Sequence, residues 1–196
     1  MRITGGAARG IPLKVPPGDA VRPATDALRQ AVFSSLGARV VDGRFFDLFA
    51  GSGAYGLEAL SRGALEGTFV EKSPKTAGCL RENIAAVKKS IAKAGEKREM
   101  TTEVLEMDVL GAPFPVPAPD LVFVDPPYEL IAEVADSIFG RIGEAATQDV
   151  IVIFELPGQL EIKPPGWVMF KRLGKGGRQP TAGFFRRVAE RLQGAS

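Results

Sequence analysis

The sequence predicts a single α/β domain built on a mostly parallel, doubly wound sheet of seven strands. Short apolar runs alternate with amphipathic stretches along most of the chain, which is the pattern of repeated βα units with right-handed crossovers. The chemically distinctive segments all follow strands, where such sheets bind ligands. With 196 residues, of which 45% are hydrophobic and 24% charged, the chain is long enough to bury one sizeable core.

The first 37 residues are expected to form a basic arm and one helix, joined in the same domain to a catalytic core over residues 38–196. Residues 1–18 are rich in Gly, Pro and Arg, and a short hairpin is expected between residues 2–3 and 13–15. Thr25 or Asp26 is expected to cap a helix that runs to residue 36, because apolar residues follow at helical spacing and Gly37 then ends it.

Alternating strands and helices are expected to make up the core. The expected strands are 45–49, 67–71, 99–106, 120–124, 149–156, 167–171 and 183–189. The expected helices are 54–61, 74–94 and 129–142, and Pro74 suits the first turn of the second. The connection 112–119 is rich in proline.

The composition excludes several kinds of chemistry. The chain has no histidine, which removes Ser-His-Asp and Cys-His triads, imidazole bases and the usual zinc ligand sets, so no metal is expected. The single cysteine, Cys79, excludes an internal disulfide, fits a reducing cytoplasm and is expected to be a half-buried spectator thiol. No apolar run approaches the length of a membrane span, and the N-terminus lacks a signal peptide's apolar segment, so we expect a cytoplasmic protein without a membrane partner.

The charge is unevenly distributed, although the net charge is only +2. Residues 1–30 carry five basic and two acidic residues, and residues 170–196 carry seven basic and one acidic, which leaves the middle with a net charge of −7. An acidic body with two basic ends predicts a polyanionic partner, and nucleic acid is the favoured one.

A glycine loop follows the first core strand. Gly51, Gly53 and Gly56 match the G-x-G-x-x-G pattern, which brings backbone N–H groups and a helix N-terminus against a ligand. Glu71 ends the next strand, where its carboxylate can hold both ribose hydroxyls of a nucleotide. These features fit either NAD or S-adenosylmethionine.

Two acidic residues favour S-adenosylmethionine over NAD. Asp47 lies inside the strand that leads to the glycine loop, where an anion repels a pyrophosphate but attracts a sulfonium or an amino group. Asp108 follows the third strand and is placed to accept from an adenine amino group. Both also have structural alternatives, a loop-bracing hydrogen bond for Asp47 and a capping role for Asp108. An NAD-dependent oxidoreductase stays open as an alternative function, ranked behind the methyltransferase and RNA-binding interpretations.

The segment Asp125-Pro126-Pro127-Tyr128 directly follows the apolar run 121–124. Two prolines make a stiff turn whose carbonyls have no neighbouring N–H to pair with. Asp125 and the Pro126 carbonyl can accept the hydrogens of an exocyclic amine and draw its nitrogen towards sp³, while Tyr128 stacks on the ring. Together with the glycine loop, this segment predicts an enzyme that methylates a ring amine; the structural alternative is a strand-ending turn with a packing tyrosine.

Several segments resemble the bacterial RsmD-type 16S rRNA guanine-N2 methyltransferases. These are FDLFAGSG at 46–53, GLEALSRGA at 56–64, FVEK at 69–72, DPPY at 125–128 and R-I-x-G-G at 2–6. The resemblance implies a class I S-adenosylmethionine-dependent methyltransferase fold that acts on 16S rRNA in a 30S assembly particle. Nothing in the sequence requires more than a monomer, which is the expected state. Residues 171–193 depart from the family's usual ending.

The resemblance also assigns roles to individual residues. It implies a cofactor pocket lined by Asp47, Phe49, Gly51, Ser52, Gly53, Glu71, Lys72 and Asp108. It places the guanine against Asp125, Pro126, Pro127 and Tyr128, and RNA or the rim of the active site against Arg9, Arg22, Thr25 and Arg29. Two alternatives stay open: an adenine-N6 methyltransferase acting on DNA or RNA, because the same four-residue segment suits adenine, and a non-catalytic rRNA-binding assembly factor.

Overall fold

The computed structural model describes residues 1–16, 23–158, 160–177 and 179–188, with residues 23–25 described by their backbone alone. Within this part of the chain, seven strands form one sheet in the order β3-β2-β1-β4-β5-β7-β6. The strands are β1 (Arg44–Leu48), β2 (Glu66–Val70), β3 (Thr101–Leu105), β4 (Leu121–Val124), β5 (Ile151–Pro157), β6 (Trp167–Leu173) and β7 (Pro180–Arg187). The predicted number of strands is thus confirmed for the described residues.

Strands β1 to β5 are parallel, and β7 is antiparallel to both of its neighbours. A parallel pair requires a long crossover connection, whereas β6 and β7 are joined by a short loop and therefore pair as a hairpin. The mostly parallel sheet was predicted correctly. The last strand was misplaced by three residues, since it begins at Pro180 instead of residue 183.

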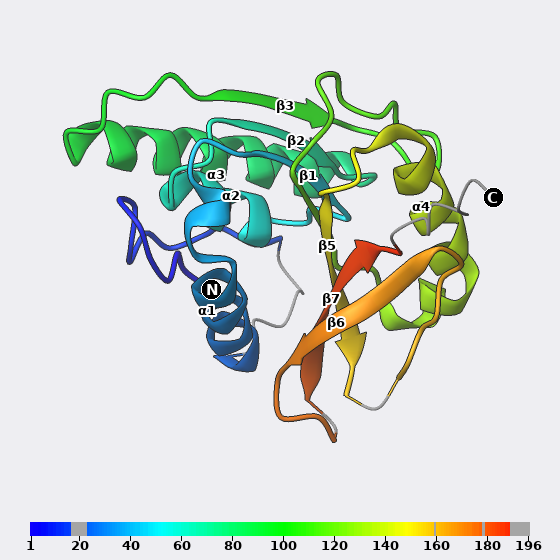
Figure 1. Ribbon diagram of the computed structural model, residues 1–196. Helices are drawn as coiled ribbons and strands as arrows, with labels where there is room; N and C mark the ends of the chain where they lie inside the picture. The colour runs from blue at the N-terminus through cyan, green and yellow to red at the C-terminus, as the bar shows by residue number, and fades with distance from the viewer. Residues whose placement is uncertain (17–22, 159, 178, 189–196) are drawn as a thin grey trace.

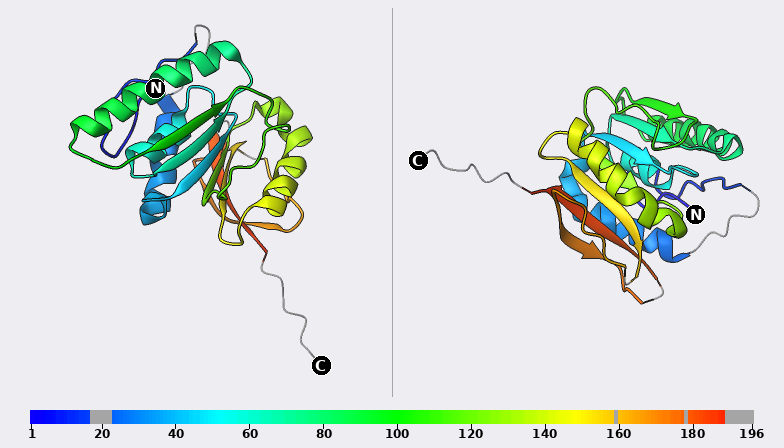
Figure 2. Two further views of the ribbon diagram at one scale, coloured as in Figure 1. Left: turned by 90° about the horizontal axis from the view of Figure 1, so that it is seen from above. Right: turned by 90° about the vertical axis from the view of Figure 1, so that its right-hand side faces the viewer.

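Helices cover both faces of the sheet (Figures 1 and 2). Helices α1 (Pro23–Leu36), α2 (Ala54–Ser61) and α3 (Pro74–Lys93) lie on one face, and α4 (Ile131–Ala145) lies on the other. Successive residues of a strand point to opposite faces, so Phe45 packs with the first group of helices and Phe46 with α4. By the same alternation, Asp47 of β1 points to the face that carries α1, α2 and α3.

Two helices differ in their starts from the prediction. Helix α1 begins at Pro23, so Asp26 stands in its first turn and does not cap it. A short 3₁₀ helix, η2 (Tyr128–Leu130), precedes α4, because the Pro127 carbonyl accepts the N–H of Leu130 at 2.9 Å and tightens the turn. A second 3₁₀ helix, η1 (Gly37–Val40), follows α1.

The N-terminal arm packs into the same core as α1, α2 and α3. Its buried side chains Ile3, Ala8 and Leu13 belong to that core. The expected hairpin is present as an isolated antiparallel bridge between Arg2 and Pro12, and the N–H of Ile3 donates to the carbonyl of Ile11 at 2.9 Å. The arm therefore brings the amino terminus of the chain to the carboxyl ends of the central strands.

Candidate functional site

A cavity of about 820 Å³ opens at the carboxyl ends of the parallel strands. From β1 the chain adds β2 and then β3 towards one edge of the sheet, and it next crosses back to place β4 on the other side of β1. The order of the strands therefore reverses between β1 and β4, which is a topological switch point. The cavity is lined by residues 1, 29, 49–52, 54–55, 70–72, 76, 108–109, 125–130, 155 and 180. Its size is within the range of small-molecule sites.

The glycine loop forms one wall of the cavity. Phe49 and Gly51 adopt positive φ angles of 60° and 55°, and the N–H of Gly53 donates to the Ala50 carbonyl at 2.7 Å, so the chain turns sharply out of β1. Gly56 lies under Phe69, where an added Cβ would stand 2.3 Å from the ring. The third glycine of the pattern therefore serves the packing of α2 on the sheet.

Asp47 lies behind the glycine loop and outside the cavity wall, contrary to the expectation that it lines the cofactor pocket. Its side chain is buried and accepts the N–H of Gly56 at 2.9 Å. Burial raises the pKa of Asp47 to about 7, the Gly56 N–H lowers it in part, and the nearby Glu71 carboxylate adds to the rise. The structural alternative, a loop-bracing hydrogen bond, is the one observed. Gly53 is likewise absent from the cavity wall and precedes α2 with a φ of 87°.

Glu71 connects the end of β2 to the glycine loop. One carboxylate oxygen accepts the N–H of Gly51 at 2.9 Å, and the other accepts the N–H of Ser73 at 2.7 Å. A carboxylate has about four lone-pair sites, so each oxygen can still accept from a ligand in the cavity. Glu71 is thus held rigidly at the place where the sequence predicted an acceptor for ribose hydroxyls.

Lys72 and Asp108 form an ion pair on the rim of the cavity. Lys72 Nζ lies 3.0 Å from Asp108 Oδ2, and the N–H of Leu110 donates to the other oxygen at 3.0 Å. These two contacts, led by the Leu110 N–H, lower the pKa of Asp108. Asp108 therefore braces the turn after β3, where no helix begins for it to cap, and it also lines the cavity.

The segment after β4, the strand that pairs with β1, forms another part of the wall. Asp125, Pro126, Pro127 and Tyr128 all line the cavity, and Tyr128 is 39% exposed. No described N–H group donates to the Pro126 carbonyl, whereas the Pro127 carbonyl is used by η2. Asp125 is exposed to the cavity, and its apolar surroundings raise the pKa of its carboxyl well above the usual value; the carboxyls of Glu155 and Asp47 raise it further, and Arg29 opposes them.

Two further residues of this wall, Tyr55 and Glu155, were missed in the sequence. The Tyr55 hydroxyl donates to Glu155 Oε2 at 2.9 Å, and the Tyr55 ring stacks on Phe123 with centroids 5.4 Å apart. Glu155 is only 6% exposed, and burial raises its pKa, while Tyr55 and Arg29 oppose that rise. The available signal was an acidic residue inside the otherwise apolar run 151–156.

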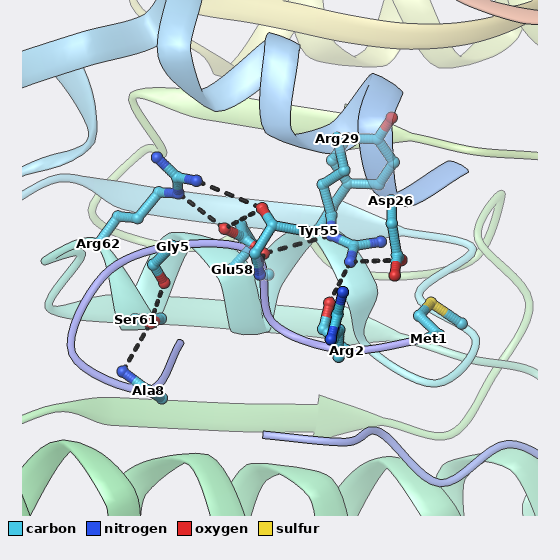
Figure 3. A network of polar contacts seen from close by, with 12 residues as sticks. Met1, Arg2, Gly5, Ala8, Asp26, Arg29, Tyr55, Glu58, Ser61 and Arg62 are labelled. Atoms are coloured by element: carbon cyan, nitrogen blue, oxygen red, sulfur yellow. Dashed lines mark hydrogen bonds and ion pairs between the residues drawn. The ribbon is translucent and has the colours of Figure 1, made fainter. Parts of the chain in front are cut away.

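Arg29, which was expected near the RNA or the rim of the active site, is an internal residue that lines the cavity. Its side chain is 2% exposed and lines the inner wall of the cavity, and its guanidinium pairs with Asp26 at 2.9 Å and with Glu58 at 3.3 Å. It also donates to the carbonyl of Arg2 (Figure 3). A guanidinium held in this way offers no surface for a phosphate.

The same network ties the arm to α1 and α2. Glu58, which is fully buried, accepts from the backbone N–H and the hydroxyl of Thr4, each at 2.7 Å, and from Arg62 at 2.7 Å. On the far side of the arm, Ser61 donates to the Gly5 carbonyl and accepts the N–H of Ala8 (Figure 3). Met1 thereby becomes part of the cavity wall.

The other residues expected at the RNA rim are only partly placed. Arg9 is exposed on the arm and does not line the cavity. Arg22 lies outside the described residues, as does the side chain of Thr25.

The cavity suits a cationic ligand. Its walls carry five acidic side chains against two basic ones, namely Glu71, Asp108, Asp125, Glu129 and Glu155 against Arg29 and Lys72. Such a surplus repels the pyrophosphate of NAD and attracts a sulfonium or ammonium group, so the residues present fit S-adenosylmethionine. In the described part of the chain, no group of three or more acidic or thiol side chains is arranged to hold a metal ion. No helix among the described residues is both long and apolar enough to cross a membrane.

Comparisons with known proteins agree with this geometry. Residues 1–180 match the family described as Conserved hypothetical protein 95. The ribosomal RNA small subunit methyltransferase D of Escherichia coli K12 is 33% identical over 174 residues, which cover 87% of this chain and 83% of that protein. The solved structure of yhhF from Escherichia coli is 27% identical with a TM-score of 0.75 and covers 97% of this chain and 99% of its own.

A more distant structure defines the fold class. The rRNA methyltransferase aviRa from Streptomyces viridochromogenes is 15% identical with a TM-score of 0.65 over 89% of this chain and 88% of its own. This likeness shows the fold alone, which is that of class I S-adenosylmethionine-dependent methyltransferases. With the family match and the relative from Escherichia coli, it leads to one conclusion: the chain is a methyltransferase that belongs to the Conserved hypothetical protein 95 family, the RsmD-type enzymes that its sequence resembles.

Proposed function

We propose that this methyltransferase uses S-adenosylmethionine to methylate the exocyclic N2 amine of a guanine in small-subunit rRNA during ribosome assembly. The observation that carries the proposal is the stiff Asp125–Tyr128 turn on the wall of an acidic cavity that the glycine loop also lines. The name of the relative from Escherichia coli supports the rRNA substrate. We further propose that the protein acts as a monomer in the cytoplasm, on a 30S assembly particle.

The cofactor half of the cavity is the wall formed by the glycine loop, Glu71 and Asp108. Glu71 would accept from the ribose hydroxyls, since both of its oxygens keep lone pairs beyond their bonds to the backbone. Asp108 would accept from the adenine amino group. When bound, S-adenosylmethionine supplies an electrophilic methyl group on a sulfonium, so the protein has no need of a metal or an imidazole.

The substrate half of the cavity is the wall formed by the Asp125–Tyr128 turn. Asp125 and the Pro126 carbonyl would accept the two N–H groups of the ring amine, which frees the nitrogen lone pair and stabilises the positive charge that develops there. The Tyr128 ring would stack on the base and set its angle, so that much of the acceleration comes from alignment. A base in a duplex must leave its stack to enter such a cavity, so an unpaired or flipped nucleotide is the expected substrate.

Arg29 and the N-terminal arm would stabilise the substrate half of the cavity from its buried side. The Arg29 charge opposes the rise in the Asp125 pKa and so favours the carboxylate that accepts the amine hydrogens. Its pairs with Asp26 and Glu58 hold it in place. RNA contacts are left to the exposed basic residues, which on the described arm are Arg2, Arg9 and Lys14.

The decisive assay is methyl transfer from labelled S-adenosylmethionine to small-subunit particles that lack the modification, followed by nucleoside mass spectrometry. N2-methylguanosine supports the proposal, and N6-methyladenosine would instead favour the adenine alternative. Tight cofactor binding without any product would favour an assembly factor.

The assay is paired with a variant of the proposed amine acceptor. Asp125→Ala is expected to abolish methyl transfer and to leave cofactor affinity, measured by titration calorimetry, within a few fold of the wild-type value. Substantial turnover by this variant would remove Asp125 from the mechanism.

A further inference from the structure

Glu155 is a buried carboxyl at the substrate end of the cavity with unused acceptor capacity. It is 6% exposed and lines the cavity. Among the described residues, the Tyr55 hydroxyl is its one hydrogen-bond donor, at 2.9 Å to Oε2. A carboxylate can accept about four hydrogen bonds, and no buried side-chain oxygen among the described residues lacks a partner, so the second Glu155 oxygen is open to the cavity. A ligand with N–H groups would supply the missing donors.

The register of the sheet places Glu155 beside Asp125. Val124 pairs with Phe154 in the parallel β4–β5 ladder, so the next residues of the two strands, Asp125 and Glu155, follow side by side. Adjacent strands are about 4.8 Å apart, and paired residues of parallel strands point to the same face. The influence of Glu155 on the pKa of Asp125 agrees with this closeness. Two carboxyls thus face the same part of the cavity.

Guanine and adenine present different edges to such a pair. The edge of guanine carries N1–H next to the N2 amine, which makes a row of donors. The corresponding edge of adenine carries the N6 amine next to an unprotonated N1, which is an acceptor. Two carboxylates match the first row, whereas a carboxylate facing the adenine N1 lone pair is repulsive and leaves both groups without a donor.

We propose that Glu155 determines base specificity by accepting the N1–H of guanine while Asp125 accepts from the N2 amine. This inference rests on the proposed guanine-N2 activity and adds to it a residue that tells guanine from adenine. Tyr55 acts as a positioning residue, because its hydroxyl holds one Glu155 oxygen and leaves the other for the base. Arg29, on α1, offsets part of the negative charge.

The test compares two bases that share the N2 amine and differ at N1, which is a donor in one and an acceptor in the other, and in the group at C6. After mass spectrometry of ribonuclease fragments has located the methylated nucleotide, that position is filled with either guanosine or 2,6-diaminopurine riboside, whose N1 is an acceptor. Wild-type enzyme is expected to prefer guanosine in kcat/KM by about 10- to 100-fold, as for the loss of one hydrogen bond to a charged group. Glu155→Gln is expected to bring this ratio to about one or to invert it, because the amide can donate to the diaminopurine N1.

Glu129→Gln is the matched control, since Glu129 also lines the cavity but is exposed on η2. It should keep the wild-type ratio. If turnover of Glu155→Gln is too slow, the ratio of the dissociation constants of the two RNAs, measured by fluorescence anisotropy, makes the same comparison.

An unchanged ratio in Glu155→Gln, or a wild-type ratio near one, overturns the role of Glu155. Failure of the proposed function is seen separately, because wild-type enzyme would then form no N2-methylguanosine at all.

Discussion

Asp47 is expected to make the stability of this protein depend on pH. Its carboxyl is 2% exposed, and burial raises its pKa from 3.8 to about 7 in the folded state. The folded protein therefore holds this proton more tightly than the unfolded chain does. The stability that Asp47 contributes is fully present below pH 3.8 and is lost as the pH rises through about 7.

The size of the effect follows from the two pKa values. One pKa unit corresponds to about 1.36 kcal/mol, so the total loss is about 4 kcal/mol, of which about 2.5 kcal/mol falls between pH 5 and pH 8. Asp47→Asn cannot titrate, yet its side-chain oxygen can still accept the N–H of Gly56. The free energy of unfolding of the variant should therefore fall less steeply with pH than that of the wild type.

Urea unfolding at several values between pH 5 and pH 8, followed by the fluorescence of the single tryptophan, Trp167, measures the difference. Trp167 is buried in the core on the α4 side and should report global unfolding. Asp120→Asn serves as a control for the amide replacement, because Asp120 is exposed and also accepts a backbone N–H, that of Arg44 at 2.8 Å. Parallel pH profiles of wild type and Asp47→Asn would refute the assignment of a strongly raised pKa to Asp47.

Three other predictions follow from single contacts. Glu58→Gln should lower the free energy of unfolding by about 3–5 kcal/mol, because Arg29 is then left as a buried charge that lacks one of its partners; a loss below about 1 kcal/mol in urea unfolding would contradict this. Gly67→Ala should cost about 1–3 kcal/mol, since the added Cβ would stand 2.0 Å from the Phe45 ring; an unchanged Tm would show that the ring moves aside freely. Glu71→Gln should weaken binding of S-adenosylmethionine by about tenfold, the effect of one charged hydrogen bond, and an unchanged dissociation constant in calorimetry would remove Glu71 from the cofactor site.

The local pattern of the sequence determined most of the secondary structure. Helix α2 was predicted at the residues where it is observed, and the core strands β1, β2 and β4 were placed within one residue, because apolar runs and glycine turns act over short distances. The reversal of β7 was not foreseen, since the direction of a strand depends on how its connection passes over the sheet.

The chemically active segments were also visible in the sequence. The glycine loop and the Asp125–Tyr128 turn are each a short continuous segment of the chain, and the structure brings both to one cavity. Their residue types alone indicated an amine-methylating enzyme, because the loop offers backbone N–H groups to a cofactor and the turn carries its acceptors and its aromatic ring within four residues.

The tertiary structure alone decided which charged side chains face the cavity. Asp125 and Glu155 are far apart in the chain and become neighbours through the β4–β5 register. Asp47 points behind the glycine loop, and Arg29 turns inward to Glu58, because packing of α1 and α2 on one face of the sheet encloses both. Whether a charged side chain is buried, paired or open to a ligand depends on residues brought together from distant parts of the chain. Local sequence patterns therefore cannot predict the environment of such a side chain.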